Sequence, residues 1–202
     1  MADDRWNHNT HYHRLALRWA PTARSALDVG CGEGHLTREL HAAGTPRVTG
    51  VDADPAQVDR ARDEARGLGV GEPALRYVVG DVLDTPSGEQ FDLVTCYATL
   101  HHLDLEAGLR RLRELTATGG HLVVVGLAGV RTPSDVALSA AAVPVAAVVD
   151  RTRGVWDHGA PMVDPAHGYG DVRRVARDVL PGVRWRRHLY WRYSLVWTAP
   201  RG

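Results

Sequence analysis

A glycine-rich stretch near the N-terminus has the residue types of a ligand-binding loop. Gly30, Gly32 and Gly34 alternate with other residues directly after an apolar run, and a helical pattern with Leu36 and Leu40 follows at once. Glycines let the backbone come close to a ligand, and a helix that begins there directs its free N–H groups at the same place. The stretch therefore predicts a site that the main chain approaches closely.

Two acidic residues at later strand ends make this prediction more specific. Asp52 ends the second predicted strand, about 22 residues after Gly30, and Asp81 follows Gly80 at the end of the third. The carboxyl ends of parallel strands meet at one edge of a doubly wound sheet, where Asp52 can accept hydrogen bonds from both hydroxyls of a ribose. Asp81 can accept from an adenine amino group while Val82 packs on the ring. Together these residues describe an adenosine site.

The loop lacks the usual phosphate-binding features, and this narrows the class of adenosine-containing ligand. The sequence has no Gly-Lys-Ser/Thr, so triphosphate binding by a P-loop is not expected. The glycines are spaced GxGxG instead of GxGxxG, and Glu33 lies where a pyrophosphate would need neutral donors. These features argue against NAD and FAD and favour a nucleoside without phosphates.

Taken in order, the motifs resemble those of a known enzyme family. The matching motifs, over roughly residues 25–127, are 27–34 (LDVGCGEG), Asp52, Gly80-Asp81, 91–94 (FDLV) and 115–120 (LTATGG). The chain resembles class I S-adenosylmethionine-dependent methyltransferases, and 100–103 (LHHL) is most similar to their small-molecule branch. One departure is 116–120 (TATGG), where the family usually has LKPGG; it reduces turn rigidity but touches no chemistry.

The resemblance implies S-adenosyl-L-methionine as cofactor and gives individual residues a role around it. The glycines would pass under its methionine and ribose parts, with Asp28 near the amino group and Tyr97 lining the sulfonium. Tyr12 and His13 could close the pocket from the N-terminal side or be ordinary packing. The full set predicted to bind the cofactor is Tyr12, His13, Asp28, Gly30, Cys31, Gly32, Gly34, Asp52, Ala53, Asp81, Val82 and Tyr97.

Two adjacent histidines, His101 and His102, follow the fourth predicted strand and are the predicted catalytic residues. The sulfonium is already activated, so most of the rate comes from holding the nucleophile in line, and a base is needed only when the nucleophile carries a proton. Alternatively, one histidine packs on the cofactor and the other caps the helix that starts near Asp104. Trp156 and His158, in an irregular insert, are predicted to contact the acceptor or to be ordinary packing.

Two clusters could indicate other ligands. His8, His11 and His13 could bind a metal ion, but no carboxylate or cysteine joins them at ligand spacing, so we predict a solvated or cofactor-facing segment and no metal. The basic and aromatic run 184–193 could face nucleic acid. However, a half-exposed strand alternates in the same way and arginine stems can cover a sheet, so nucleic acid is not the expected partner.

The composition excludes several classes of protein. The 202 residues include 24 acidic and 24 basic residues, all of the latter arginine, and this balance gives no general attraction to nucleic acid or anionic membranes. Cys31 and Cys96 cannot build a disulfide framework, the N-terminus lacks a signal-peptide pattern, and no apolar run reaches the ~20 residues of a spanning helix. We therefore expect a cytoplasmic protein, monomer or homodimer, with no membrane partner.

The elements that must position these residues follow an alternating pattern. Predicted strands cover 26–29, 48–51, 75–79, 91–96, 122–125, 183–190 and 192–198, and predicted helices cover 8–20, 35–43, 55–66, 105–115, 132–150 and 171–180. Apolar strands between amphipathic helices indicate a parallel sheet covered on both faces. With the resemblance, the expected fold is α/β, a Rossmann-like doubly wound seven-stranded sheet, mostly parallel, with an antiparallel C-terminal hairpin.

The expected organisation is one methyltransferase domain over residues 1–202. It comprises an N-terminal helical cap (1–24), a cofactor-binding core (25–127), a substrate-side insert (128–170) and a C-terminal helix and hairpin (171–202). The leading functional hypothesis is in-line methyl transfer to a small-molecule acceptor, with O-, N- or C-transfer undecided. The alternatives are an RNA methyltransferase and a non-catalytic S-adenosylmethionine-binding partner protein.

Overall fold

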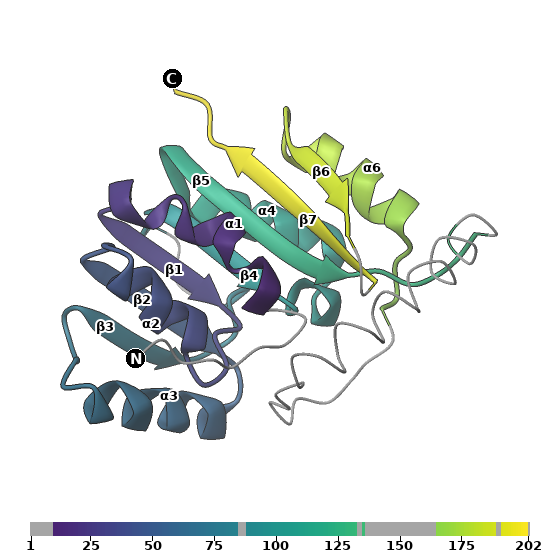
Figure 1. The fold of residues 1–202 in the computed structure, drawn as a ribbon. Coiled ribbons are helices and arrows are strands. Elements are labelled where there is room, and N and C mark those ends of the chain that lie inside the picture. The colour runs from purple at the N-terminus through teal and green to yellow at the C-terminus, as the bar shows by residue number, and fades with distance from the viewer. Residues whose placement is uncertain (1–9, 85–87, 133–134, 136–164, 189–190, 202) are drawn as a thin grey trace.

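The fold is a seven-stranded mixed sheet, seen in a computed structural model that describes all residues except 1–9, 85–87, 133–134, 136–164, 189–190 and 202. The strand order is β3-β2-β1-β4-β5-β7-β6 (Figure 1). The strands are β1 (Ser25–Val29), β2 (Arg47–Asp52), β3 (Leu75–Val79), β4 (Phe91–Tyr97), β5 (Thr116–Leu127), β6 (Arg184–Arg187) and β7 (Arg192–Thr198). The first five are parallel, and β7 is antiparallel to both β5 and β6, which confirms the predicted fold class.

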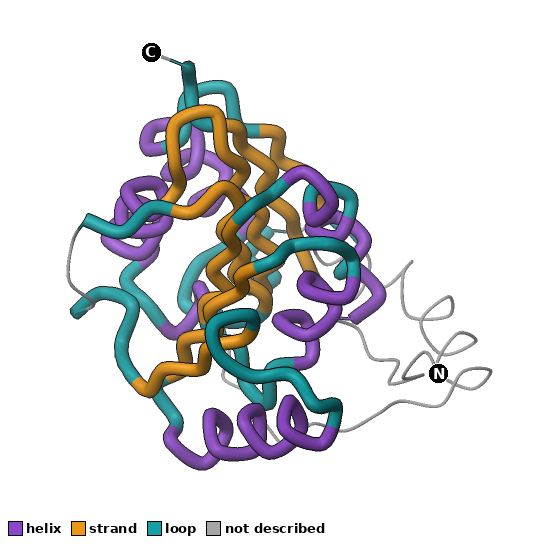
Figure 2. The backbone as a smooth tube through the Cα atoms, turned by 90° about the vertical axis from the view of Figure 1, so that its left-hand side faces the viewer, coloured by secondary structure: helices purple, strands orange, loops and turns teal. Residues whose placement is uncertain are grey.

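Helices cover both faces of the sheet, as the edge-on view in Figure 2 shows. On one face, α1 (Arg14–Leu17), α2 (His35–Ala42) and α3 (Pro55–Gly67) share an apolar core with Leu93 and Val123. On the other, α4 (Leu105–Leu115) and α6 (Tyr169–Val179) share a second core with Val94 and Leu122. Neighbouring residues of one strand thus enter different cores, because successive side chains of a strand point to opposite faces.

Aspartate side chains cap the N-termini of α3 and α4, the helices that follow β2 and β4. The Asp54 side chain accepts from Ala56 N (2.8 Å) at the start of α3, where Pro55 supplies a pre-set φ in the first turn. The Asp104 side chain accepts from Ala107 N (2.9 Å) and caps α4. The alternative in which a histidine caps this helix is therefore wrong, since Asp104 itself does so.

The N-terminal segment differs from the single helix predicted for 8–20. Within its described part it forms short turns: η1 (Thr10–Tyr12), α1 and η2 (Ala20–Thr22). Tyr12 O accepts from Tyr97 Oη (3.0 Å) and Ala20 O accepts from Thr45 Oγ1 (3.0 Å). Side chains from the sheet and from the turn after α2 therefore take carbonyls that a continuous helix would use internally.

A second difference lies in β5, which begins at Thr116 and so runs through the turn expected before the predicted strand 122–125. Between Phe91 and Leu93 the partner position moves from Thr116 to His121, so β5 carries extra residues as a bulge. A Cβ at Gly120 would stand 2.9 Å from Asp92 O, so the backbones approach too closely there for a side chain. The glycines expected to end a turn instead let the strand bulge and continue.

Other boundaries agree closely or lie outside the described residues. The helix predicted for 171–180 begins two residues earlier, at Tyr169, and β6 ends at Arg187, before the two residues that are not described. Most of the Ala/Val-rich stretch 132–150, and the predicted acceptor contacts Trp156 and His158, lie outside the described residues. Within the described part, no helix has the length and apolar character needed to cross a membrane.

Candidate cofactor and active site

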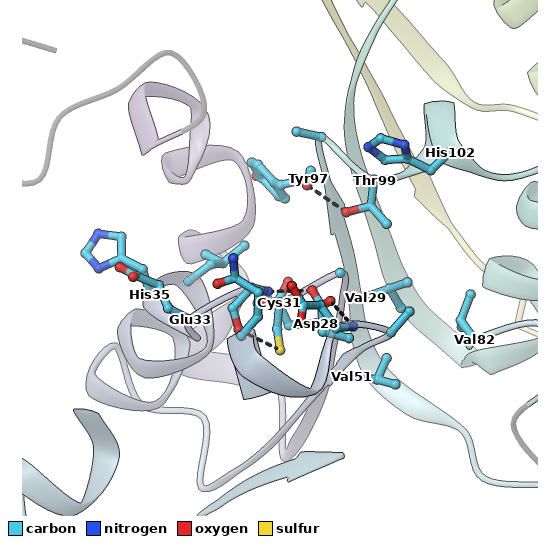
Figure 3. Close-up of a pocket in the computed structure, with 18 of the residues that line it drawn as sticks. Asp28, Val29, Cys31, Glu33, His35, Val51, Val82, Tyr97, Thr99 and His102 are labelled. Atoms are coloured by element: carbon cyan, nitrogen blue, oxygen red, sulfur yellow. Dashed lines mark hydrogen bonds between the residues drawn. The ribbon is translucent and has the colours of Figure 1, made fainter. Parts of the chain in front are cut away.

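A cavity of about 610 Å³ opens where the carboxyl ends of β1, β2 and β4 meet α2 and η3 (Leu100–His102). Figure 3 shows Asp28, Cys31 and Glu33 on one side of it and Tyr97, Thr99 and His102 on the other. The predicted site residues that line it are His13, Asp28, Gly30, Cys31, Gly32, Asp52, Ala53, Asp81, Val82, Tyr97 and His102. The topology thus brings most of the predicted site together at one edge of the sheet.

Three of the predicted site residues that the structure describes do not line this cavity. Gly34 lies at the N-cap of α2. Tyr12 is buried behind the wall, where its carbonyl holds the Tyr97 hydroxyl and its ring lies 4.7 Å from that of His188. His101 is also set back, with its ring 4.0 Å from that of His102. Tyr12 and His101 therefore support lining residues instead of lining the cavity themselves.

The glycine loop is shaped by left-handed backbone and by crowding. Gly30 has φ +70°, its N–H donates to Val51 O (2.8 Å), and a Cβ there would lie 1.9 Å from Thr99 Oγ1. Gly32 has φ +52°, but a Cβ would meet only Gln57 Oε1 at 3.9 Å. Position 30 therefore needs a glycine because a side chain would collide with Thr99. Gly32 instead keeps space in the cavity free for a ligand.

Asp52 ties the loop to the end of β2. Its Oδ2 accepts from Gly32 N (2.8 Å) and its Oδ1 from Asp54 N (2.9 Å). A carboxylate offers about four lone-pair positions, so two bonds leave it able to accept more. Its orientation is fixed by main-chain donors, which is the arrangement needed to receive a pair of vicinal hydroxyls.

Asp28 lies deeper, 2% exposed, at the end of β1. Its oxygens accept from Thr95 Oγ1 (2.8 Å) and Thr37 Oγ1 (2.9 Å). Burial raises the pKa of the Asp28 carboxyl, while the two hydroxyl bonds oppose that rise. Burial also raises the pKa of the Cys31 thiol far above its ordinary value, which keeps this cysteine protonated and unsuited to nucleophilic attack.

The opposite wall carries the aromatic and histidine groups. Thr99 Oγ1 donates to Tyr97 O (3.0 Å), which places both residues beside the loop. His102 is exposed to the cavity, whereas His101 is half-buried. Burial, followed by the charges of His102 and Arg192, lowers the pKa of His101 to about 4. His101 is therefore neutral at pH 7, and His102 is the member of the pair that can reach a ligand.

Sequence reasoning missed His35 and Glu39, which lie beside His13 on the N-terminal side of the cavity. His13 Nδ1 lies 2.5 Å from Glu39 Oε2, and His35 Nε2 lies 3.7 Å from Glu39 Oε1. The hydrogen bond from His13, followed by the charges of His13 and His35, outweighs burial and lowers the pKa of Glu39. The only sequence signal was the i, i+4 spacing of His35 and Glu39, which places both on one face of a helix.

Fold and site together are typical of Rossmann-like proteins that bind a nucleoside. The donor set fits S-adenosylmethionine: a cradle without side chains at Gly32, a fixed acceptor at Asp52, and an apolar wall at Val82 beside Asp81. The fit is one of chemical type, because these groups could match the polarity of the parts of an adenosine at the switch point of the sheet.

Comparisons with known proteins identify the family. A family model described as a methyltransferase domain matches residues 26–120. An uncharacterized methyltransferase of Mycobacterium tuberculosis is 34% identical over 205 residues, covering 98% of this chain and 99% of the relative. The chain therefore belongs to the S-adenosylmethionine-dependent methyltransferases, and its cofactor is S-adenosylmethionine.

Solved structures agree at the level of the fold. Magnesium protoporphyrin IX methyltransferase from Synechocystis PCC 6803 with bound S-adenosylhomocysteine has a TM-score of 0.63 at 18% identity, covering 94% of this chain and 82% of that one. N-methyltransferase NodS from Bradyrhizobium japonicum WM9 with the same product has a TM-score of 0.64 at 19% identity, covering 98% and 93%. Both are similar folds that bind the methyl-donor product.

Proposed function

We propose that this methyltransferase acts on a small-molecule acceptor by in-line methyl transfer, giving S-adenosylhomocysteine. The observation that carries this proposal is the charge of the cavity. Its described lining includes five carboxylates and no arginine, although the chain has 24 arginines. A substrate with a phosphate backbone needs cationic contacts, and their absence from the described lining favours a compact neutral or cationic acceptor. The carboxylates are Asp28, Glu33, Asp52, Asp54 and Asp81.

The size of the cavity supports the same acceptor class, as do the names of some related enzymes. Small-molecule pockets commonly measure about 300–1,000 Å³, and this cavity measures about 610 Å³. One solved neighbour is named as acting on magnesium protoporphyrin IX, and a relative from Alkalilimnicola ehrlichii is a ubiquinone biosynthesis O-methyltransferase, 35% identical over 101 residues. These acceptors are small molecules, whereas two other relatives are named a ribosomal protein L11 methyltransferase and a tRNA U34 carboxymethyltransferase, so the proposal depends on the cavity more than on the relatives.

The cofactor supplies a methyl group already activated on a sulfonium, so the chain's own task is positioning. In this proposal Asp52 holds the ribose, and Asp81 with Val82 holds the adenine. Asp28 lies near the amino group, and Tyr97 lines the sulfonium. The other lining members of the predicted set, His13, Gly30, Cys31, Gly32 and Ala53, shape the surrounding wall.

The proposed base is His102, which faces the cavity and would accept a proton from a protonated nucleophile. His101 is the positioning residue, because its ring packs 4.0 Å from that of His102. The lowered pKa of His101 keeps it neutral, so it adds no repelling charge beside a protonated His102.

The arginine-rich end of the chain is the feature that could favour RNA instead. One of its arginines, Arg187, serves internal contacts, and one of its aromatic rings, Trp185, is covered by an arginine from another element. Arg187 bonds Asp135 (2.6 Å) and lies over the Tyr169 ring, and the Trp185 ring is covered by Arg173 of α6. Arg184 and Arg186 are exposed on β6. These arginine contacts are those expected at a half-exposed strand, so they give no specific support to an RNA acceptor and leave the small-molecule acceptor favoured.

A labelled-methyl assay tests the acceptor class. Purified protein is incubated with S-adenosylmethionine carrying a radioactive methyl group and, separately, with low-mass metabolite, RNA and protein fractions, with heat-denatured enzyme as the blank. Label is expected in the low-mass fraction. Label only in RNA or protein would overturn the acceptor class, and label in no fraction would favour the non-catalytic binding partner.

With an acceptor in hand, two histidine variants test the catalytic roles. His102→Ala is expected to lower kcat by about 10²–10⁴-fold, the usual contribution of a base, with S-adenosylhomocysteine affinity unchanged. His101→Ala is expected to lower kcat less, and His101→Phe to restore it, because the ring contact returns without the imidazole. Unchanged kcat in His102→Ala would show that no base is supplied at this position.

A further inference from the structure

A cluster of two imidazoles and one carboxylate lies on the N-terminal side of the cavity, where His13 and His35 line the wall and Glu39 lies beside them. His35 opens α2, and Glu39 follows one turn later on the same helix face. His13, only 6% exposed, comes from the segment directly before α1, which packs on α2. No carboxylate was predicted to join the N-terminal histidines at ligand spacing; the fold brings one to His13 from 26 residues away.

The donor atoms of this cluster are close enough to share one ion. One ligand atom from each of His13, His35 and Glu39 lies within 4.8 Å of the other two. Ligands of one tetrahedral ion at ~2.1 Å bond length stand roughly 3.4 Å apart, so small side-chain rotations suffice. The His13 ring stands edge-on to Tyr97 at 5.2 Å, which limits its orientations before any ion arrives.

The surroundings also favour a cation. His13 and His35 line the same cavity as the buried Asp28 and the carboxylates of Glu33 and Asp52. A doubly charged ion placed there would be attracted by these groups, and no arginine of the described lining would compete for the position.

We propose that His13, His35 and Glu39 form a binding site for a divalent transition-metal ion, of the Zn²⁺ or Co²⁺ class, on the cavity wall. Two imidazole nitrogens and one carboxylate are a ligand set that such ions favour. Three protein ligands leave a coordination position for water or a ligand atom from the cavity. This site goes beyond methyl transfer and needs no cofactor to form.

The competing explanation is a hydrogen-bonded anchor. In that case the 2.5 Å contact between His13 and Glu39 would serve only to fix the N-terminal segment on α2. The two explanations differ in one measurable respect. Glu39→Gln keeps a hydrogen-bonding group of the same shape beside His13, but an amide is a much poorer ligand for the ion than a carboxylate.

Titration with cobalt chloride distinguishes the metal site from the hydrogen-bonded anchor. Metal-stripped protein without a histidine tag and without S-adenosylmethionine is titrated with Co²⁺, and visible absorption reports the coordinated ion. One ion per chain is expected, displaced by Zn²⁺. Glu39→Gln and His35→Ala should each weaken Co²⁺ binding at least about tenfold, since loss of outer partners alone typically costs about 10–100-fold. Unchanged melting temperature of Glu39→Gln would show that its fold is intact.

Two histidine variants provide matched controls. His11 lies near His13 in the chain, and His41 lies on α2 with its ring bonded to Thr45 O (3.0 Å), so neither belongs to the cluster. His11→Ala and His41→Ala should bind Co²⁺ like the wild type. The proposal is overturned if wild-type protein gives no cobalt spectrum, if Glu39→Gln and His35→Ala titrate unchanged, or if either control loses the ion. Failure here leaves the methyltransferase assay unaffected, because no cofactor or acceptor is present.

Discussion

At the scale of single residues, the Asp52 carboxylate is prepared before a ligand arrives. Main-chain donors from the loop and from the turn into α3 hold one oxygen each. Because its orientation is already fixed, little side-chain entropy remains to be lost when a ribose binds. The proposed selectivity for a nucleoside therefore rests on a group whose geometry the fold sets.

Asp52→Asn should weaken S-adenosylhomocysteine binding by at least about tenfold. An amide has one accepting oxygen, and a hydrogen bond to a charged group is worth about 1.5–3 kcal/mol, where 1.4 kcal/mol is tenfold in affinity. Calorimetric titration measures the effect. Asp59→Asn, an exposed position on α3, is the control and should bind normally. Equal affinities of Asp52→Asn and wild type would show that Asp52 does not hold the ribose.

His101 makes stability depend on pH in a defined direction. Its folded-state pKa is lowered from 6.5 to about 4 by burial, and no described group bonds its buried Nδ1. The unfolded chain therefore takes a proton at a pH where the folded protein does not, so acidification between these values favours unfolding. Below about pH 4 both states carry the proton, and the loss is complete.

His101→Phe should remove this dependence. The variant has no proton to take up and no orphaned nitrogen, so its advantage in melting temperature over wild type should grow as the pH falls from 7 to 5. Thermal unfolding at several pH values measures the difference, with His101→Gln as a second non-titrating replacement. A constant difference across this range would show that His101 titrates normally in the folded protein.

At the scale of elements, the glycine loop separates fold requirements from ligand requirements. An L-residue in left-handed backbone costs about 1–2 kcal/mol, and crowding adds about 1–3 kcal/mol. Gly30→Ala meets both, since its Cβ would lie 1.9 Å from Thr99 Oγ1, and should lose about 2–5 kcal/mol of stability. Gly32→Ala meets only the first, but its methyl group enters the cavity and should reduce cofactor affinity strongly.

Gly69→Ala is the matched control for this pair. Gly69 also has positive φ (+70°), in the connection from α3 to β3, and no atom lies within 4 Å of an added Cβ. It should lose about 1–2 kcal/mol, as Gly32→Ala does, while binding S-adenosylhomocysteine normally. Denaturant unfolding and calorimetry give the two readouts. If Gly32→Ala binds the product as tightly as Gly69→Ala, the loop does not carry the cofactor.

The elements also show where sequence reasoning succeeds. The strand Leu75–Val79 agrees with its prediction to the residue, and the helix Leu105–Leu115 contains the whole predicted leucine stripe, because local patterning decides a buried strand and an amphipathic helix. The N-terminal segment and the bulge in β5 were missed for the opposite reason. Tertiary partners decided them: Tyr97 and Thr45 take helix carbonyls, and β4 crowds the backbone at Gly120.

The candidate site follows the same division. Asp52 and Asp81 could be predicted because strand ends share an edge in any parallel sheet, and the cavity contains both. Thr99 and Glu39 could not be, since their contacts with Gly30 and His13 depend on how separate segments pack. Sequence motifs thus identify the side chains whose position follows from the strand topology. The side chains whose position depends on packing between distant segments can be identified only from the structure.

At the scale of the whole molecule, one sheet joins two apolar cores. Leu40 of α2 lies in the core on one face and Leu109 of α4 in the core on the other, and both are fully buried. Because the cavity opens where the loop after β1 meets the segment after β4, its two walls belong to different layers. Site geometry therefore depends on both cores remaining fixed to the same strands.

This dependence predicts that the chain unfolds as one domain. Leu40→Ala and Leu109→Ala should each lower the free energy of unfolding by about 2–5 kcal/mol, the usual range for a buried leucine. Since the two share no core, their effects should add in the double variant and shift one cooperative transition. Circular dichroism and tryptophan fluorescence during urea unfolding measure this. Two separate transitions, with each variant moving only one, would show that the faces unfold independently and that the cavity spans two folding units.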